Sequence, residues 1–362
     1  MKKLDKYIIK KFLGTFIFSI VLILGIAIVF DLSEKLDNFI DHKAPFKAVI
    51  FDYYLNFIPY FAILFSSLFV FISVIYFTSK MAYNSEIIAI ISNGVSFYRL
   101  LVPYMFSALV IAVGSFLISN FLLPHANARR LAFEEVYVGR TQRYRSNNYN
   151  IHRQVRPNLY IYMQSYSPIS KSGQKFSIEK FDEQGKLKSK LLADYVRWDT
   201  ATHKWKINNY YIRIISDSLH EKIEKGIRMD TTFFLTPDDL ATRKNITETL
   251  NLGELKQFVK NQRLQGTENI EEYEIALHNR FSFPFSAFIL TLIGLSLSSR
   301  KLKGGIGVQI GTGIALSFAY ILFMQFSSQF AIGGNMNPLL ASWLPSMIFA
   351  VIATILFFMT PK

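Results

Sequence analysis

The chain has 362 residues, of which 51% are hydrophobic and 34 are phenylalanine, and its mean hydropathy of +0.24 indicates a membrane protein. It contains no cysteine, which excludes disulfides and thiolate metal sites. The net charge of +14 is unevenly placed, because residues 304–361 carry no charge whereas residues 124–280 are rich in both signs. This pattern follows membrane topology and argues against a nucleic-acid-binding protein.

Six uncharged apolar runs are long enough to cross the roughly 30 Å hydrocarbon core as helices. They cover residues 12–30, 57–77, 100–123, 281–297, 306–326 and 339–359. Lysine and arginine in short loops resist translocation, and they gather on one side of these runs, at Lys2, Lys3, Lys6, Lys10, Lys11, Lys80, Arg99, Arg300, Lys301 and Lys303. The sequence therefore predicts six transmembrane helices, cytoplasmic termini, and an outer location for the region between helices 3 and 4.

In the region between residues 149 and 237, apolar residues alternate with polar ones, as in half-buried strands. Short polar turns without intervening helices predict an antiparallel all-β domain of the jellyroll or sandwich type, with about eight strands. Helical connectors are expected at 253–264 and 271–280. We therefore divide the chain into residues 1–123 (helices 1 to 3), 124–270 (a jellyroll-like domain with helical connectors) and 271–362 (helices 4 to 6).

No motif indicates catalysis. The six histidines are too scattered for an HExxH or paired metal motif, and no GxSxG nucleophile elbow occurs. The glycine-rich stretch 304–313 lacks the Gly-Lys-Ser/Thr ending of a phosphate-binding loop. We therefore expect no catalytic residue, no metal site and no bound cofactor. Because the spans are uncharged, we expect the energy for any transport to come from a partner protein instead of an ion gradient.

The cytoplasmic segment 84–97 predicts a short helix between two spans. Ser85 and Glu86 indicate where the helix begins, and Gly94 indicates where it ends. Its apolar surface consists of Ile87, Ile88, Ile90 and Ile91. Such a helix suits docking into a groove on another protein, although it could also lie on lipid headgroups.

The fifth helix begins with closely spaced glycines, including Gly307, Gly311 and Gly313. Small residues at this spacing allow another helix to approach closely. The pattern fits tight packing inside one subunit and packing against a second subunit equally well.

Six segments resemble the LptF/LptG (YjgP/YjgQ) permease family, the membrane part of the ABC exporter that extracts lipopolysaccharide from the bacterial inner membrane. In chain order they are LDKYIIKKFLGTF, FDLSEKLDNFI, SEIIAIISNGVS, NFLLPHANARR, EYEIALHNRFSFPFSAFILTLIGLSLS and NPLLASWLPSMIF. The resemblance spans nearly the whole chain and applies to the F and the G subunits alike.

This resemblance implies a multi-pass protein of the Gram-negative inner membrane that pairs with a similar permease subunit. It also implies a cytoplasmic LptB-like ATPase dimer that uses the ATP. The β-domain would be periplasmic and would pass the lipid to an LptC/LptA-like bridge protein toward the outer membrane.

The same resemblance assigns roles to individual residues. Residues 85–94 would form a coupling helix, with Glu86 as its polar contact to the ATPase, and helices 1 and 5 would gate a lipid cavity. Lys35 lies where family members place a base near the lipid's phosphates, and an ordinary solvated lysine is the alternative interpretation. Arg129 and Arg130 could attract phosphates or could extend to lipid headgroups.

Two other functions share much of this pattern. One is an exporter of the same build for another lipid or for a lipoprotein. The other is a membrane-anchored enzyme that modifies envelope lipids or glycans, which should carry convergent acidic or histidine side chains in the β-domain and work without an ATPase.

Overall fold

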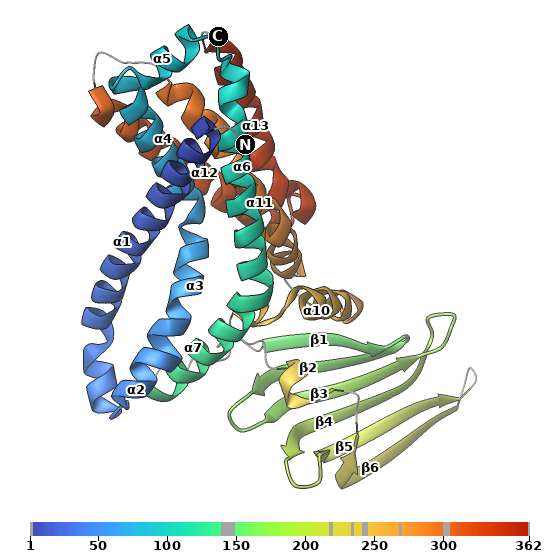
Figure 1. Ribbon diagram of the computed structural model, residues 1–362. Coiled ribbons are helices and arrows are strands. Elements are labelled where there is room, and N and C mark those ends of the chain that lie inside the picture. The colour runs from blue at the N-terminus through green and yellow to red at the C-terminus, as the bar shows by residue number, and fades with distance from the viewer. Residues whose placement is uncertain are drawn as a thin grey trace. The chain divides into compact units, whose positions relative to one another are not determined.

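A computed structural model describes residues 3–138, 149–216, 220–232, 235–240, 245–267, 270–299 and 305–360. The chain forms two compact units. The helical unit contains Met1–Gly139, Thr247–Leu255 and Glu271–Lys362, and the sheet unit contains Arg140–Ile246 and Lys256–Ile270. The predicted α-helical membrane protein with an inserted antiparallel β-domain is confirmed (Figure 1).

Among the described residues, six helices are long and apolar enough to cross a membrane. The long helices of this unit are α1 (Lys3–Asp41), α3 (Leu55–Leu64), α4 (Ser66–Tyr83), α6 (Phe97–Leu117), α7 (Leu123–Tyr137), α11 (Ile270–Ser298), α12 (Gly305–Ile332) and α13 (Pro338–Met359). Short elements connect them, namely α2 (Phe46–Ala48), the π-helical turns η1 (Val49–Tyr54) and η2 (Ile118–Leu122), α5 (Glu86–Ser92) and α9 (Ile246–Thr249).

The third span differs from our sequence-based division. The polarity of residues 124–137 places them in the outer domain, but α7 continues α6 through η2 and belongs to the helical unit. Asn127, Arg130 and Phe133 form part of its buried face. Polarity was therefore a poor guide here, because Asn127 and Arg130 find a partner, Glu248, within the helical unit.

Helices α4 and α11 lie at the centre of the helical unit. In the most apolar stretch of each span, 72% of α4 and 61% of α11 is buried, against 11% of α1 and 22% of α12. Glycines permit the close packing of these helices. A Cβ added to Gly294 of α11 would lie 2.8 Å from Val74 of α4, and one added to Gly313 of α12 would overlap Ile75 of α4.

The start of α1, the short helix α5 and the end of α13 lie at one end of the helical unit, and α2 and α7 lie at the other (Figure 1). At the first end, the rings of Phe97 and Phe357 are 5.8 Å apart. Membrane orientation stays a prediction, and Lys2 and the bases at 300–303, which contribute to it, lie outside the described residues.

The sheet unit contains six strands, each paired antiparallel with the next, so that the sheet order follows the chain. They are β1 (Tyr149–Arg156), β2 (Leu159–Ser167), β3 (Ser172–Phe181), β4 (Leu187–Asp199), β5 (Lys204–Ser216) and β6 (His220–Thr231). One sheet face is buried around Phe176, Val196, Trp205 and Ile207. The segment after β6 covers part of this face, where Trp205 Nε1 donates a hydrogen bond to the Leu235 carbonyl oxygen (2.8 Å).

The described strands are fewer than the roughly eight expected of a jellyroll, and they form one sheet. Strands β4 and β5 have 13 residues each. Because these strands are long, the alternating region forms fewer strands than we expected. The alternation of buried and exposed side chains is also interrupted at Lys175 of β3 and Asn209 of β5, which have positive φ angles of 48° and 51°. Alternation thus predicted half-buried strands correctly, but it does not set their length or number.

The predicted helical connectors are present as α10 (Leu252–Leu264) and the start of α11, together with a short α8 (Pro237–Leu240). A reciprocal cap begins α10, because Glu254 N donates to Asn251 Oδ1 and Asn251 N donates to Glu254 Oε2, both at 2.9 Å. At the first edge of the sheet, Gln154 N donates to the Gln265 carbonyl oxygen (3.1 Å). No described strand pairs with the outer edge of β6.

Candidate functional site

The helix α5 is the first candidate region. It lies between Ser85 and Gly94, both of which have left-handed backbone conformations (φ 61° and 82°). The predicted apolar residues do not all face outward. Ile87 is buried, and Ile90 and Ile91 pack against the same core cluster, whereas Ile88 is 58% exposed. Most of the apolar surface of α5 therefore fixes it to its own helical unit, and Ile88 stays available to a partner.

Glu86, at the start of α5, is held by two side chains. Tyr7 Oη donates to Glu86 Oε2 (3.2 Å), and Asn84 Nδ2 donates to Glu86 Oε1 (3.3 Å). Close by along the chain, Arg99 Nη2 forms an ion pair with Asp5 Oδ2 at 2.7 Å. The first two turns of α1 thus contact both α5 and the helix that follows it.

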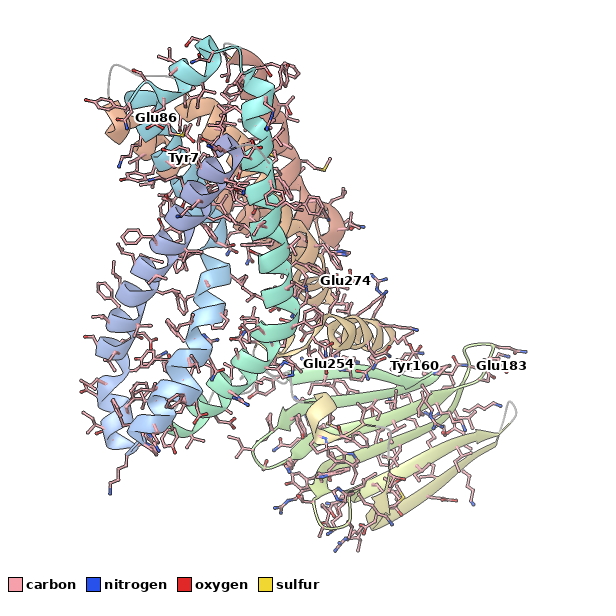
Figure 2. The ribbon with its side chains drawn as sticks, viewed as in Figure 1. Tyr7, Glu86, Tyr160, Glu183, Glu254 and Glu274 are labelled. Atoms are coloured by element: carbon pink, nitrogen blue, oxygen red, sulfur yellow. The ribbon has the colours of Figure 1, made fainter. Side chains whose placement is uncertain are left out.

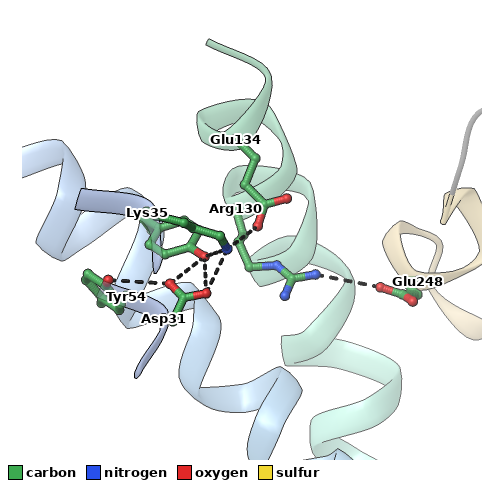
Figure 3. A network of polar contacts seen from close by, with 7 residues as sticks. Asp31, Lys35, Tyr54, Arg130, Glu134 and Glu248 are labelled. Atoms are coloured by element: carbon green, nitrogen blue, oxygen red, sulfur yellow. Dashed lines mark hydrogen bonds and ion pairs between the residues drawn. The ribbon is translucent and has the colours of Figure 1, made fainter. Parts of the chain in front are cut away.

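The second candidate region is a network of charged side chains at the opposite end of the helical unit (Figure 3). Lys35 of α1 is 7% exposed. Its Nζ lies 2.7 Å from Asp31 Oδ1 and 3.5 Å from Glu134 Oε1 of α7, and it donates to the hydroxyl of Tyr53. Tyr53 donates in turn to Asp31 Oδ2 (2.9 Å). Burial and the Asp31 carboxylate raise the pKa of Tyr53, so its hydroxyl keeps the proton that it donates.

Arg130 extends the network toward α9. Its guanidinium lies over the ring of Tyr60, 4.3 Å from the centroid, and 3.8 Å from Glu248 Oε2. Asn127 Nδ2 donates to the backbone carbonyl oxygen of Glu248 (3.4 Å). Burial raises the pKa of the Glu248 carboxyl, and the positive charges of Arg130 and Arg280 act in the opposite direction.

Arg280 of α11 fixes the segment around α9 to the helical unit. It donates from Nη1 to the Ser119 carbonyl oxygen (2.9 Å), and from Nη2 to the carbonyl oxygens of Thr247 (2.9 Å) and Leu250 (2.8 Å). Its guanidinium therefore joins η2 to the segment 247–250 through backbone acceptors of both.

The structure separates the three bases that we predicted to bind phosphate. Lys35 and Arg130 are buried and already lie beside carboxylates, whereas Arg129 is exposed on the other face of α7. The three predicted packing glycines also divide. Gly313 packs against α4 within the subunit, whereas a Cβ added to Gly307 or Gly311 would meet no atom within 4 Å.

Sequence reasoning missed Tyr7, Tyr53, Glu134, Glu248 and Arg280. One contact of Lys35 could have been predicted from the sequence. The four-residue spacing of Asp31 and Lys35 indicates an ion pair on one helix face. The other partners come from distant parts of the chain, and no local pattern brings them together. Among the described residues, no group of three or more histidine or acidic side chains could hold a metal ion.

The chain thus combines six apolar helices with an inserted sheet and two regions of paired charges. A model of the lipopolysaccharide export system permease family LptF/LptG matches residues 6–359. The chain belongs to the LptF/LptG family. This confirms the resemblance that the six sequence segments indicate, and it identifies the chain as a component of a transport system. No curated protein matches this permease.

Proposed function

We propose that the chain is the permease subunit of an ATP-driven ABC exporter that extracts lipopolysaccharide from the inner membrane and passes it to a periplasmic bridge toward the outer membrane. The observation that carries this proposal is the family match over residues 6–359. In this proposal the chain is a non-catalytic subunit that binds no cofactor. Both termini are cytoplasmic and the sheet unit is periplasmic.

An apolar cavity is needed, because each CH₂ group moved into water costs about 0.8 kcal/mol. Helices α1 and α12 are the spans that the chain itself covers least. On α12, the exposed residues Gly307, Gly311, Phe318 and Leu322 recur at helical spacing. We propose that this face and the exposed face of α1 meet a second, similar permease subunit around the lipid. The open space at Gly307 and Gly311 supports close approach of that subunit.

We propose that α5 is the coupling helix to a cytoplasmic LptB-like ATPase dimer. Two features support this role. The carboxylate of Glu86 lies at the start of the helix, and Ile88 is exposed beside it. The residues Ser85 and Gly94 bound the helix, and Ile87, Ile90 and Ile91 anchor it to the permease.

The phosphates of the lipid would meet the three predicted bases in different ways. Arg129 is exposed and can bind an anion directly. Lys35 and Arg130 are neutralised by Asp31, Glu134 and Glu248. A phosphate would therefore have to replace a carboxylate at either base, which its higher charge and its additional acceptor oxygens favour.

The outer edge of β6 suits the proposed contact with an LptC/LptA-like bridge protein. An exposed strand edge can pair with a strand of another chain. Ile223 and Ile227 of β6 are 56% and 83% exposed, so β6 offers apolar side chains as well as an edge that no described strand pairs with.

Depletion of the protein in cells tests the proposed function. We expect newly made lipopolysaccharide to accumulate in the inner membrane, as measured by membrane fractionation after pulse labelling. Normal arrival at the outer surface would contradict the export of this lipid. Activity of the purified chain on envelope lipids or glycans without an ATPase would instead favour the alternative of a membrane-anchored enzyme.

Glu86→Arg tests the coupling role of α5. Because the substitution reverses the charge at the proposed contact, we expect the ATPase to be lost when the permease is purified. Glu183→Arg, an exposed glutamate of the sheet unit, is the matched control and should retain the ATPase. Equal recovery of the ATPase with both variants would exclude Glu86 as the contact.

A further inference from the structure

The hydrogen bond between Tyr7 and Glu86 joins residues that are 79 positions apart in the sequence (Figure 2). With Asn84 donating to the second oxygen, both oxygens of the Glu86 carboxylate have a donor within the permease. A carboxylate has about four acceptor positions. The two hydrogen bonds therefore orient Glu86 and still leave room for a cationic group of a partner protein.

The same end of α1 is fixed to the surroundings of α5 by further contacts. Arg99, on the helix after α5, pairs with Asp5 at 2.7 Å. Ile8 and Phe12 of α1 are fully buried and belong to the core cluster that contains Ile87. The first three turns of α1 thus share both polar and apolar contacts with α5 and the start of α6.

The backbone on either side of α5 does not continue the neighbouring helices. Ser85 separates α5 from α4, and Gly94 separates it from α6, each through a left-handed residue. A displacement of α5 is therefore not passed along a continuous helix. Side-chain contacts decide which helices move with α5. Its core cluster includes residues of α1, α4 and α6, and α1 adds the hydrogen bond from Tyr7 to Glu86.

We propose that Tyr7 is a positioning residue, which holds the Glu86 carboxylate in place and makes α1 move together with α5. This inference rests on the proposed coupling role of α5. Helix α1 is one continuous helix from Lys3 to Asp41, and its middle is largely uncovered by the rest of the chain. Motion of α5 would therefore displace one wall of the proposed lipid cavity directly.

Tyr7→Phe tests this role, because it removes the hydroxyl and keeps the ring, whose centroid lies 6.4 Å from that of Phe77. The variant would be assembled with the second permease subunit and the ATPase in proteoliposomes. We expect assembly, thermal stability and ATP hydrolysis close to wild type. The lipopolysaccharide released per ATP hydrolysed should fall about twofold, because the lost hydrogen bond is exposed and weak.

Tyr76→Phe is the matched control. Tyr76 is a tyrosine of α4 with 42% exposure, and we expect its variant to keep the wild-type amount of lipid per ATP. If the wild-type complex exports and Tyr7→Phe exports equally well per ATP, the role of Tyr7 is overturned while the proposed function stands. Loss of the ATPase from the Tyr7→Phe complex also overturns it, because Tyr7 would then serve assembly. A wild-type complex that releases no lipid overturns the proposed function itself.

Discussion

Two polar contacts of α1, one near each end, differ in burial. Near α7, Lys35 is buried and has two carboxylates and a tyrosine hydroxyl around it. Near α5, Tyr7 is 39% exposed and reaches Glu86 through a single hydrogen bond of 3.2 Å.

This difference has an energetic consequence. A buried charge that loses its partner costs several kcal/mol, whereas an exposed polar contact costs little to break. The network around Lys35 is therefore costly to break. The contact between Tyr7 and Glu86 contributes little to stability, and its proposed role is to position the Glu86 carboxylate.

The largest effect on stability is expected for Lys35→Met. The substitution leaves Asp31 and Glu134 without their shared cation, so the free energy of unfolding should fall by about 3–5 kcal/mol. Denaturant titration of the chain in detergent measures this change. Lys10→Met, on the exposed face of the same helix, should change stability by less than about 0.5 kcal/mol. Equal stability of the two variants would mean that the buried network does not stabilise the fold.

A smaller difference in stability is expected between Tyr53→Phe and Tyr7→Phe. The two variants are closely matched, because each removes one hydroxyl that donates to a carboxylate. Tyr53 is fully buried, and the loss of its bonds to Lys35 and Asp31 should cost about 1.5–3 kcal/mol. Tyr7→Phe should cost under about 0.5 kcal/mol, because water can replace the lost hydroxyl. The same titration measures both. The reverse order would contradict the assignment of a strong contact to Lys35 and a weak one to Tyr7.

The smallest effect is expected at an exposed carboxylate of the sheet unit. Asp199 lies 2.5 Å from Lys206 Nζ and accepts from Ala201 N and Thr202 Oγ1, and these contacts lower its pKa to about 2. The unfolded value is about 3.9. Because the folded pKa is the lower one, ionised Asp199 stabilises the fold above about pH 4, and this contribution is lost as the pH falls toward 2.

Asp199→Asn should therefore flatten the acid dependence of stability over that range. Hydrogen exchange of β4 and β5 in the full chain, corrected for intrinsic rates, measures it at pH 5 and at pH 3. Asp194→Asn is the control and should retain the wild-type loss of protection at the lower pH. An unchanged pH dependence in Asp199→Asn would remove Asp199 as its source.

Several features of the fold could be predicted from short stretches of sequence. Uncharged runs of about 20 residues indicate spans because the hydrocarbon core has a fixed thickness. Alternation between residues 149 and 237 indicates half-buried strands. The helix α5 follows from Ser85, Glu86 and Gly94, because helix ends are set by nearby residues.

Other features depended on the tertiary structure. The spacing of Gly311 and Gly313 indicates close packing for both, yet only the packing of α12 on α4 shows that Gly313 faces inward. Polarity suggests that Lys35 and Arg130 face water, but partners from α7 and α9 allow them to be buried.

The sequence by itself determined the membrane class, the six spans, the inserted β-domain and the family resemblance, because hydrophobicity and periodicity are properties of short segments. The tertiary structure decided that six long strands form one sheet, that Ile87 faces the core, and that Tyr7 reaches Glu86. These outcomes depend on which distant surfaces pack together, and no local pattern encodes that choice.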